Sequence, residues 1–166
     1  PGTAWPGDFG TMLAVHYVGA GILFLVATYH LVYHLARRET ALLPRRGDLR
    51  ASFQILKAMV THTPEPPSDK YLPEQRLTYA YIGGNVVLVT LTGMVKIAKN
   101  LPGIALPSEA LWTATVMHNV AAVLLAVAVV AHLVAFAIPA NRKLLPSMFT
   151  GKVDLTYAEE RHCLWC

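Results

Sequence analysis

The sequence predicts an all-α integral membrane protein, a helical bundle of three transmembrane helices that forms one domain over residues 1–166. Hydrophobic residues make up 54% of the chain and charged residues only 14%, whereas soluble domains carry about 25% charged residues. Three stretches contain no Asp, Glu, Lys or Arg, namely 9–36, 77–95 and 110–141. Each comes close to or exceeds the roughly 20 residues that cross a hydrocarbon core of about 30 Å. We therefore expect spanning helices over about 9–36, 77–97 and 109–138.

The basic residues indicate how these helices are oriented. The segment before the first helix has no Lys or Arg, the segment between the second and third has only Lys96 and Lys99, and the loop 37–76 has eight. By the positive-inside rule, the N-terminus lies outside, whereas the loop 37–76 and the tail 139–166 are cytoplasmic. The first and third helices then run parallel. The formal net charge of +4 reflects this topology and contact with membrane lipid, and it gives no indication of nucleic acid binding.

Two histidine pairs stand out within the apolar stretches. His16 and His30 lie on the first helix, His118 and His132 lie on the third, and each pair is fourteen residues apart. Fourteen residues at about 100° each return to within about 40° of the starting direction, so both histidines of a pair project from one helix face. They lie about 21 Å apart along the axis, which is too far for one metal ion whose ligands lie within about 2.3 Å. Two separate sites are indicated.

Facing histidines on two parallel helices suit the axial positions of haem iron. His16 would face His118 at one depth and His30 would face His132 about four turns deeper, so that each couple clamps one iron with the porphyrin between the helices. Ionisable side chains in hydrocarbon are costly and usually mark function. The pattern therefore predicts two haem b groups. The alternative is that the histidines only form hydrogen bonds with neighbouring helices.

The loop 37–76 contains the main cytoplasmic feature that the sequence predicts. Its segment Asp48–His62 has apolar residues spaced for a short amphipathic helix on the membrane surface, and four prolines follow between positions 64 and 73. This segment is either a platform for a soluble electron-carrying partner or a plain connection between two helices. His62 is expected to be solvated.

The second spanning helix has no histidine but is rich in small and polar residues. Gly83, Gly84 and Gly93 allow close backbone approach, either in ordinary helix packing or against the flat face of a macrocycle. Polar side chains on this helix are candidates for orienting ligand imidazoles through hydrogen bonds. These are Tyr79, Tyr81, Asn85, Thr90 and Thr92.

The tail carries a pattern that resembles a known family. The matching residues are Gly151, Lys152, Val153, Tyr157, Ala158, Arg161, His162 and Trp165. Together with the spacing of His118 and His132, this tail resembles the membrane cytochrome b (gamma) subunit of respiratory formate dehydrogenases, and the resemblance covers nearly the whole chain. It implies a single membrane cytochrome b domain in a bacterial or archaeal cytoplasmic membrane. It also implies an iron–sulfur electron-transfer subunit and a catalytic oxidoreductase subunit as partners, with no catalysis by this chain alone.

The resemblance also implies roles for individual histidines. It makes His16 and His118 the ligands of the haem nearer the outside, and His132 one ligand of the haem nearer the cytoplasm. In that family, the fourth ligand comes from a helix that precedes the first helix seen here. His30 takes that place in an arrangement similar to cytochrome b of quinol-oxidising complexes. The alternatives are His34 and a ligand from an upstream helix, which is allowed for because the chain begins at Pro1.

Two further features of the sequence leave alternatives open. In the same family a polar run before the second helix contributes to a menaquinone pocket, and of residues 72–75 only Gln75 matches it. A menaquinone or ubiquinone site near Gln75 and His132 is therefore expected, unless the chain exchanges electrons only with other proteins. Cys163 and Cys166 form a C-x-x-C pair, for which reduced thiols are expected on the cytoplasmic side and an iron–sulfur or zinc site shared with a partner is the alternative.

These features together predict electron transfer across or within the membrane, between an iron–sulfur or catalytic partner and quinone or another carrier. The alternative is a non-redox membrane anchor of a peripheral complex. A proton or metal-ion pathway is disfavoured, because the residues between His16 and His30 are mostly apolar.

Overall fold

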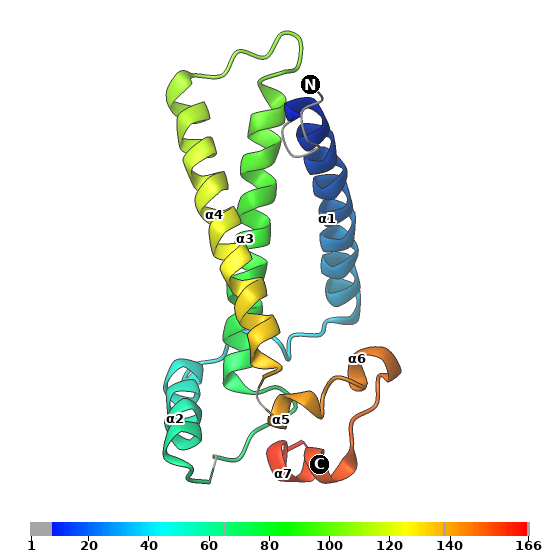
Figure 1. The fold of residues 1–166 in the computed structure, drawn as a ribbon, viewed down its shortest axis with the longest axis vertical. Helices are drawn as coiled ribbons and strands as arrows, with labels where there is room; N and C mark the ends of the chain where they lie inside the picture. The colour runs from blue at the N-terminus through cyan, green and yellow to red at the C-terminus, as the bar shows by residue number, and fades with distance from the viewer. Residues whose placement is uncertain (1–7, 65, 138, 166) are drawn as a thin grey trace. The chain divides into compact units, whose positions relative to one another are not determined.

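The computed structural model describes residues 8–64, 66–137 and 139–165, and these residues form helices, turns and loops without any strand (Figure 1). Among the described residues, three helices are long and apolar enough to cross a membrane: α1 (Phe9–Arg37), α3 (Pro73–Ala98) and α4 (Ser108–Ala135). The shorter helices are α2 (Asp48–Thr61), α5 (Pro139–Arg142), α6 (Ser147–Thr150) and α7 (Leu155–Arg161). The predicted all-α membrane fold with three spanning helices is confirmed.

The ends of the spanning helices differ slightly from the expected ones. α3 begins at Pro73, about four residues before the predicted start, because proline at the first helical position needs no hydrogen-bond partner and already has a helical φ. The Oε1 atom of Gln75 also accepts the backbone N–H of Leu72 at 3.0 Å. α4 ends at Ala135, and the predicted last residue, 138, lies outside the described residues.

The chain divides into two units, one that ends at Glu39 and one that begins at Thr40. The first unit consists essentially of α1. Asp8 caps its N-terminus by accepting the backbone N–H of Thr11 at 3.0 Å, and Arg38 ends it in the left-handed conformation at a φ of 52°. None of the residues of α1 is buried within its unit, and apart from its histidines its side chains are mostly apolar, as expected for a membrane-spanning helix. The parallel arrangement of α1 and α4 stays a prediction.

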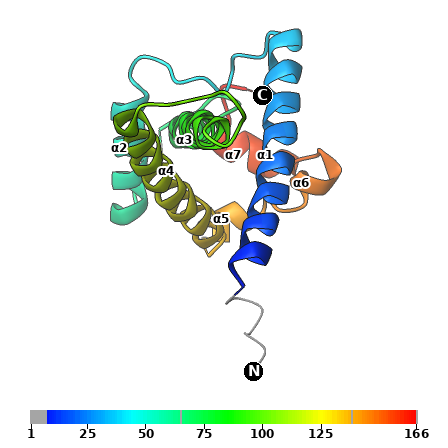
Figure 2. The same ribbon diagram turned by 90° about the horizontal axis from the view of Figure 1, so that it is seen from above.

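The second unit is built on the contact between α3 and α4, which lie side by side in both views (Figures 1 and 2). The buried residues of α4 are Ala114, Ala121 and Ala128, spaced by seven. Those of α3 include Asn85 and Thr92, also spaced by seven. A seven-residue spacing keeps one stripe facing the partner helix, and small side chains allow the two backbones to approach closely. The two helices therefore form a tight antiparallel pair.

A buried ion pair fastens α2 to the start of α3. Arg76 donates from Nη2 to Oδ1 of Asp48 at 2.6 Å and from Nε to Oδ2 at 2.9 Å, and the two side chains are only 7% and 6% exposed. Arg76 also donates to the Tyr71 carbonyl, and Asp48 accepts the backbone N–H of Arg45 at 2.7 Å. The guanidinium of Arg76 lowers the pKa of Asp48 to about 2. The predicted amphipathic helix is thus confirmed as α2, and its position relative to α3 is fixed.

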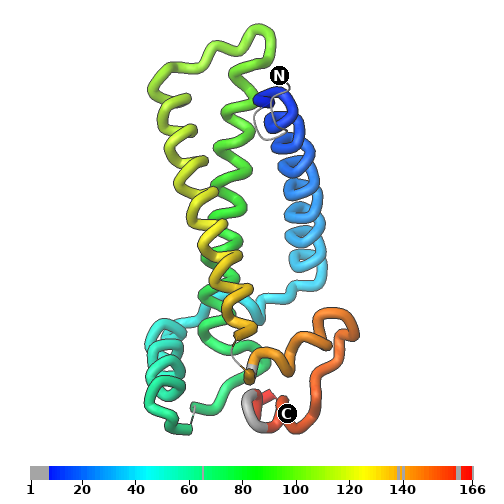
Figure 3. Tube along the Cα trace, in the orientation of Figure 1, coloured from blue at the N-terminus to red at the C-terminus, as the bar shows by residue number. Residues whose placement is uncertain are grey.

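The tail returns to the segment that precedes α3 (Figure 3). Tyr157, Ala158 and His162 are buried. Nδ1 of His162 donates to the carbonyl of Asp69 at 2.8 Å, and the backbone N–H of Leu164 donates to the carbonyl of Ser68 at 3.2 Å. Three of the tail residues that carry the resemblance, Tyr157, Ala158 and His162, therefore act in packing within this unit.

We predict that Arg76→Met destabilises the second unit strongly, because it leaves the Asp48 carboxylate buried without its partner. Removing one partner of a buried ion pair costs about 3 to 5 kcal/mol of unfolding free energy. Denaturant unfolding in detergent micelles measures this loss. Arg46→Met is the matched control, since Arg46 is exposed, and an equal loss in both variants would contradict the prediction.

The same pair predicts a dependence of stability on pH. Because the pKa of Asp48 in the folded protein is about 2 and that of an unfolded aspartate is about 3.9, its contribution is complete above about pH 4 and is lost as the pH falls toward about 2. The difference in stability between the wild type and Arg76→Met should therefore shrink over this interval. If the difference stayed constant down to pH 2, the stability that the pair provides would not depend on the ionisation of Asp48.

Candidate functional site

One unbroken helix carries the two histidines of the third apolar stretch. His118 and His132 both lie within α4, fourteen residues apart, which corresponds to about 21 Å along the axis and to nearly one face. The prediction that this pair projects from a single continuous helix is confirmed. The two imidazoles have very different surroundings.

His118 is half-buried and lies against α3. Its Nδ1 atom is 3.1 Å from Oγ1 of Thr92. A Cβ atom built on Gly93 would lie 3.3 Å from Cε1 and 3.7 Å from Nδ1 of the same ring. Thr92 and Gly93 were two of several candidates on the second helix, and only the folded chain shows that both meet His118. The absence of a side chain at position 93 leaves the room that the imidazole occupies.

His132 is exposed, in contrast to the half-buried His118. Its ring meets the ring of Phe136, the residue that follows the end of α4, edge-on at a centroid distance of 5.4 Å. Beyond it, Arg142 donates to the carbonyls of Phe136 and Ala137 at 2.9 Å and 3.1 Å, which satisfies carbonyls left without helical partners at the end of α4. Arg142 therefore has a capping role at the end of α4.

The histidines of α1 lie on the other unit. His16 and His30 are exposed there. The rings of His30 and His34 are 4.4 Å apart, and Nδ1 of His34 lies 3.6 Å from the Glu39 carboxylate. His34 is thus engaged at the C-terminal end of α1, beside His30. The couples His16–His118 and His30–His132 join residues of two units and stay a prediction.

The histidines of the spanning helices are suited to bind haem. Within the described residues, no group of three or more His, Cys, Asp or Glu side chains gathers as a metal site. Haem iron needs only two axial ligands from the protein. His118 offers an imidazole whose Nδ1 lies beside a polar partner, the arrangement by which metal-binding histidines are oriented.

Gln75 has a structural role in addition to the predicted one. Its Oε1 atom accepts the backbone N–H of Leu72 and so caps α3. Because the oxygen is engaged, the NH₂ of the side-chain amide is the part suited to donate a hydrogen bond to a further ligand. The quinone site stays a prediction.

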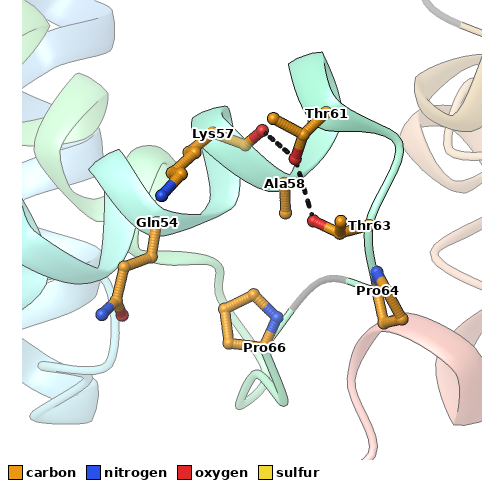
Figure 4. Close-up of a pocket in the computed structure, with 7 residues that line it drawn as sticks. All are labelled: Gln54, Lys57, Ala58, Thr61, Thr63, Pro64 and Pro66. Atoms are coloured by element: carbon orange, nitrogen blue, oxygen red, sulfur yellow. Dashed lines mark hydrogen bonds between the residues drawn. The ribbon is translucent and has the colours of Figure 1, made fainter.

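Two other features lie away from the histidines of the spanning helices. A hollow of about 590 Å³ beside α2 is lined by Gln54, Lys57, Ala58, Thr61, Thr63, Pro64 and Pro66 (Figure 4). It includes neither Gln75 nor any candidate haem ligand. His62 is exposed, as expected. Cys163 is exposed with a free thiol, whereas Cys166 lies outside the described residues.

The family model described as prokaryotic cytochrome b561 matches residues 1–151. The chain belongs to the prokaryotic cytochrome b561 family. The match includes all three spanning helices and the four candidate histidines. Membership identifies the chain as a membrane protein that binds haem b and transfers electrons. A comparison with curated proteins finds no match.

We predict that Gly93→Ala in this cytochrome lowers haem retention, because the new methyl group presses on the His118 ring at 3.3 Å. Gly84→Ala is the matched control, since nothing lies within 4 Å of a Cβ there. Each change should add about 0.5–1 kcal/mol of helix stability where the space allows it. Haem per chain and the absorption spectrum of purified variants measure the effect. Identical haem content in both variants would contradict the contact inferred at Gly93.

Proposed function

We propose that this cytochrome is the di-haem membrane subunit of a respiratory oxidoreductase complex. The observation that carries the proposal is the pair of histidines on one face of α4, separated by about 21 Å, of which His118 is oriented by α3. That separation leaves room for two haem groups stacked across the membrane. Histidines of the spanning helices would hold each haem, which would supply a one-electron carrier that exchanges electrons without binding substrate.

The ligand couples that we propose are His16 with His118 and His30 with His132. The equal spacing of fourteen residues on both helices supports this assignment, because it brings both couples level when the two helices run parallel. The distribution of basic residues supports the parallel arrangement independently. His34 and a histidine from an upstream helix are the alternatives to His30.

The place of the cytochrome in a complex follows from its resemblance to formate dehydrogenase gamma subunits. We propose an iron–sulfur subunit with a catalytic subunit on one side of the electron path, and menaquinone or ubiquinone on the other. The orientation supported by the basic residues puts the His132 end of α4, Gln75 and α2 on the cytoplasmic side. The amide of Gln75 is the group that we expect to meet a quinone carbonyl.

A count of haem b per chain tests the ligand assignment. A pyridine haemochrome assay on the purified wild type should give two haems, and His118→Ala, His132→Ala and His30→Ala should each give one. His62→Ala is the control for the chemistry of the substitution, because His62 lies exposed at the end of α2, and it should keep both.

The outcomes separate the competing assignments. Two haems in His30→Ala would move the fourth ligand to His34 or to a helix other than α1, α3 and α4. No haem in the wild type would overturn the proposal and favour the membrane anchor. One haem in the wild type would restrict the site to a single couple.

Gln75→Glu tests the quinone contact without removing the helix cap. A glutamate keeps an oxygen for the Leu72 N–H but has no amide to donate, so quinol-dependent haem reduction should slow at unchanged thermal stability. Gln54→Glu, in the hollow beside α2, is the matched control. Unchanged reduction kinetics in Gln75→Glu would remove Gln75 from the quinone site.

A further inference from the structure

We propose that Thr92 is the positioning residue of His118: it fixes the imidazole tautomer, so that Nε2 carries the lone pair that binds iron, and it tunes the potential of that haem alone. The proposal rests on the proposed function of His118 as a haem ligand. It assigns a role to a side chain on α3, whose sequence contains no histidine. The proposal follows from the direction in which the Thr92 hydroxyl donates its single proton.

The hydroxyl of Thr92 has a single proton, and the distances indicate where that proton lies. Oγ1 is 2.6 Å from the Leu88 carbonyl and 3.2 Å from the Val89 carbonyl. Two oxygen atoms at 2.6 Å need a proton between them, and a carbonyl has none to give. The hydroxyl therefore donates to Leu88, one helical turn earlier. Its lone pair is then left facing Nδ1 of His118 at 3.1 Å.

This assignment determines the state of the imidazole. A nitrogen that lies at 3.1 Å from an oxygen whose proton points elsewhere must itself donate the hydrogen bond. Nδ1 of His118 is thus the protonated nitrogen, and in the neutral ring the lone pair lies on Nε2. The second nitrogen of a metal-binding histidine is typically held by such a bond.

The packing around the bond limits how the ring can turn. Thr92 is buried, with 7% of its surface exposed, and it lies on the face of α3 that meets α4. Gly93 borders the Cε1 edge of the ring. The imidazole is therefore held at one nitrogen by Thr92, and its Cε1 edge lies close to position 93, where glycine leaves room for it, so its tautomer is determined by α3.

The second histidine of α4 provides a contrast within the same molecule. In the described part of the chain, His132 has a ring contact with Phe136 and no hydrogen bond to a threonine. A hydrogen bond donated by Nδ1 makes the ligand more basic, and a more basic ligand favours the ferric state and lowers the midpoint potential. The loss of the Thr92 hydroxyl should therefore raise the potential of the His118 haem and leave the His132 haem unchanged.

The experiment compares Thr92→Val, Thr92→Ser and Thr90→Val with the wild type in the intact cytochrome. A redox titration followed by absorbance gives the potential of each haem, and the haem lost in His118→Ala identifies which of the two belongs to His118. Thr92→Val, which keeps the shape of the side chain, should raise that potential enough to increase the reduced-to-oxidised ratio several-fold at a fixed potential. Haem affinity at that site should fall about 10-fold.

The two other variants control for packing. Thr92→Ser restores a hydroxyl that can donate to the helix carbonyl and should return the potential toward that of the wild type. Thr90→Val, two residues away, should change neither haem. Selective change in Thr92→Val with rescue in Thr92→Ser supports the proposal.

Three results would overturn it. These are an unchanged potential and affinity in Thr92→Val, an equal change in both haems, and a Thr92→Ser variant that behaves like Thr92→Val. Each of them can occur in a protein that binds two haems, so the proposed function would stand. A wild type without haem would remove both proposals, and the haem count detects that outcome before any titration.

Discussion

The close contact between α3 and α4 is the interaction on which the rest of the second unit depends. It uses the smallest apolar side chain on one helix, with Ala114, Ala121 and Ala128 in a single stripe, and polar side chains on the other. Those polar groups are bonded to their own helix, as Asn85 is to the Tyr81 carbonyl at 2.8 Å and Thr92 to the Leu88 carbonyl. A polar side chain satisfied in this way can lie in an apolar seam without a large cost. It also keeps a lone pair for a neighbour, and His118 uses that of Thr92.

The ion pair between Asp48 and Arg76 extends this arrangement beyond the spanning helices. It ties the first residue of α2 to the first turn of α3, and the tail reaches the same region through Ser68 and Asp69. Three segments that are distant in sequence therefore meet where α3 begins. Gln75, which caps that start, lies among them, so the candidate quinone contact is placed on a part of the chain that is held from several sides.

Most of the fold could be predicted from sequence, because the physical signals are local. The uncharged stretches predict the three spanning helices, and the spacing of apolar residues over Asp48–His62 predicts α2. The start of α3 was missed because the charged residues Glu74 and Arg76 end the uncharged run, although a buried partner for Arg76 lets the helix continue through them. That partner, Asp48, is 28 residues away, so no local pattern reveals it.

The candidate site was predictable only in part, for a related reason. Equal spacing identified His118 and His132, since both lie on one helix. The partners of His118 on α3 depend on how two helices pack, and several polar residues on that helix were equally suited to the role. The couples with His16 and His30 depend on the placement of α1 against the other unit, which neither spacing nor the fold of each unit determines.

The restraint of His118 has a consequence for the speed of electron transfer. Each time a metal centre gains or loses an electron, its ligands and surroundings relax, and the energy of that relaxation slows the reaction. An imidazole held by Thr92 and bordered by Gly93 has little freedom to relax, and apolar helices supply few dipoles that reorient. The exposed ring of His132 lacks this restraint within its own unit. With His118 and His132 as the proposed haem ligands, the reorganisation energy should therefore differ between the two ends of α4, with the smaller value at His118.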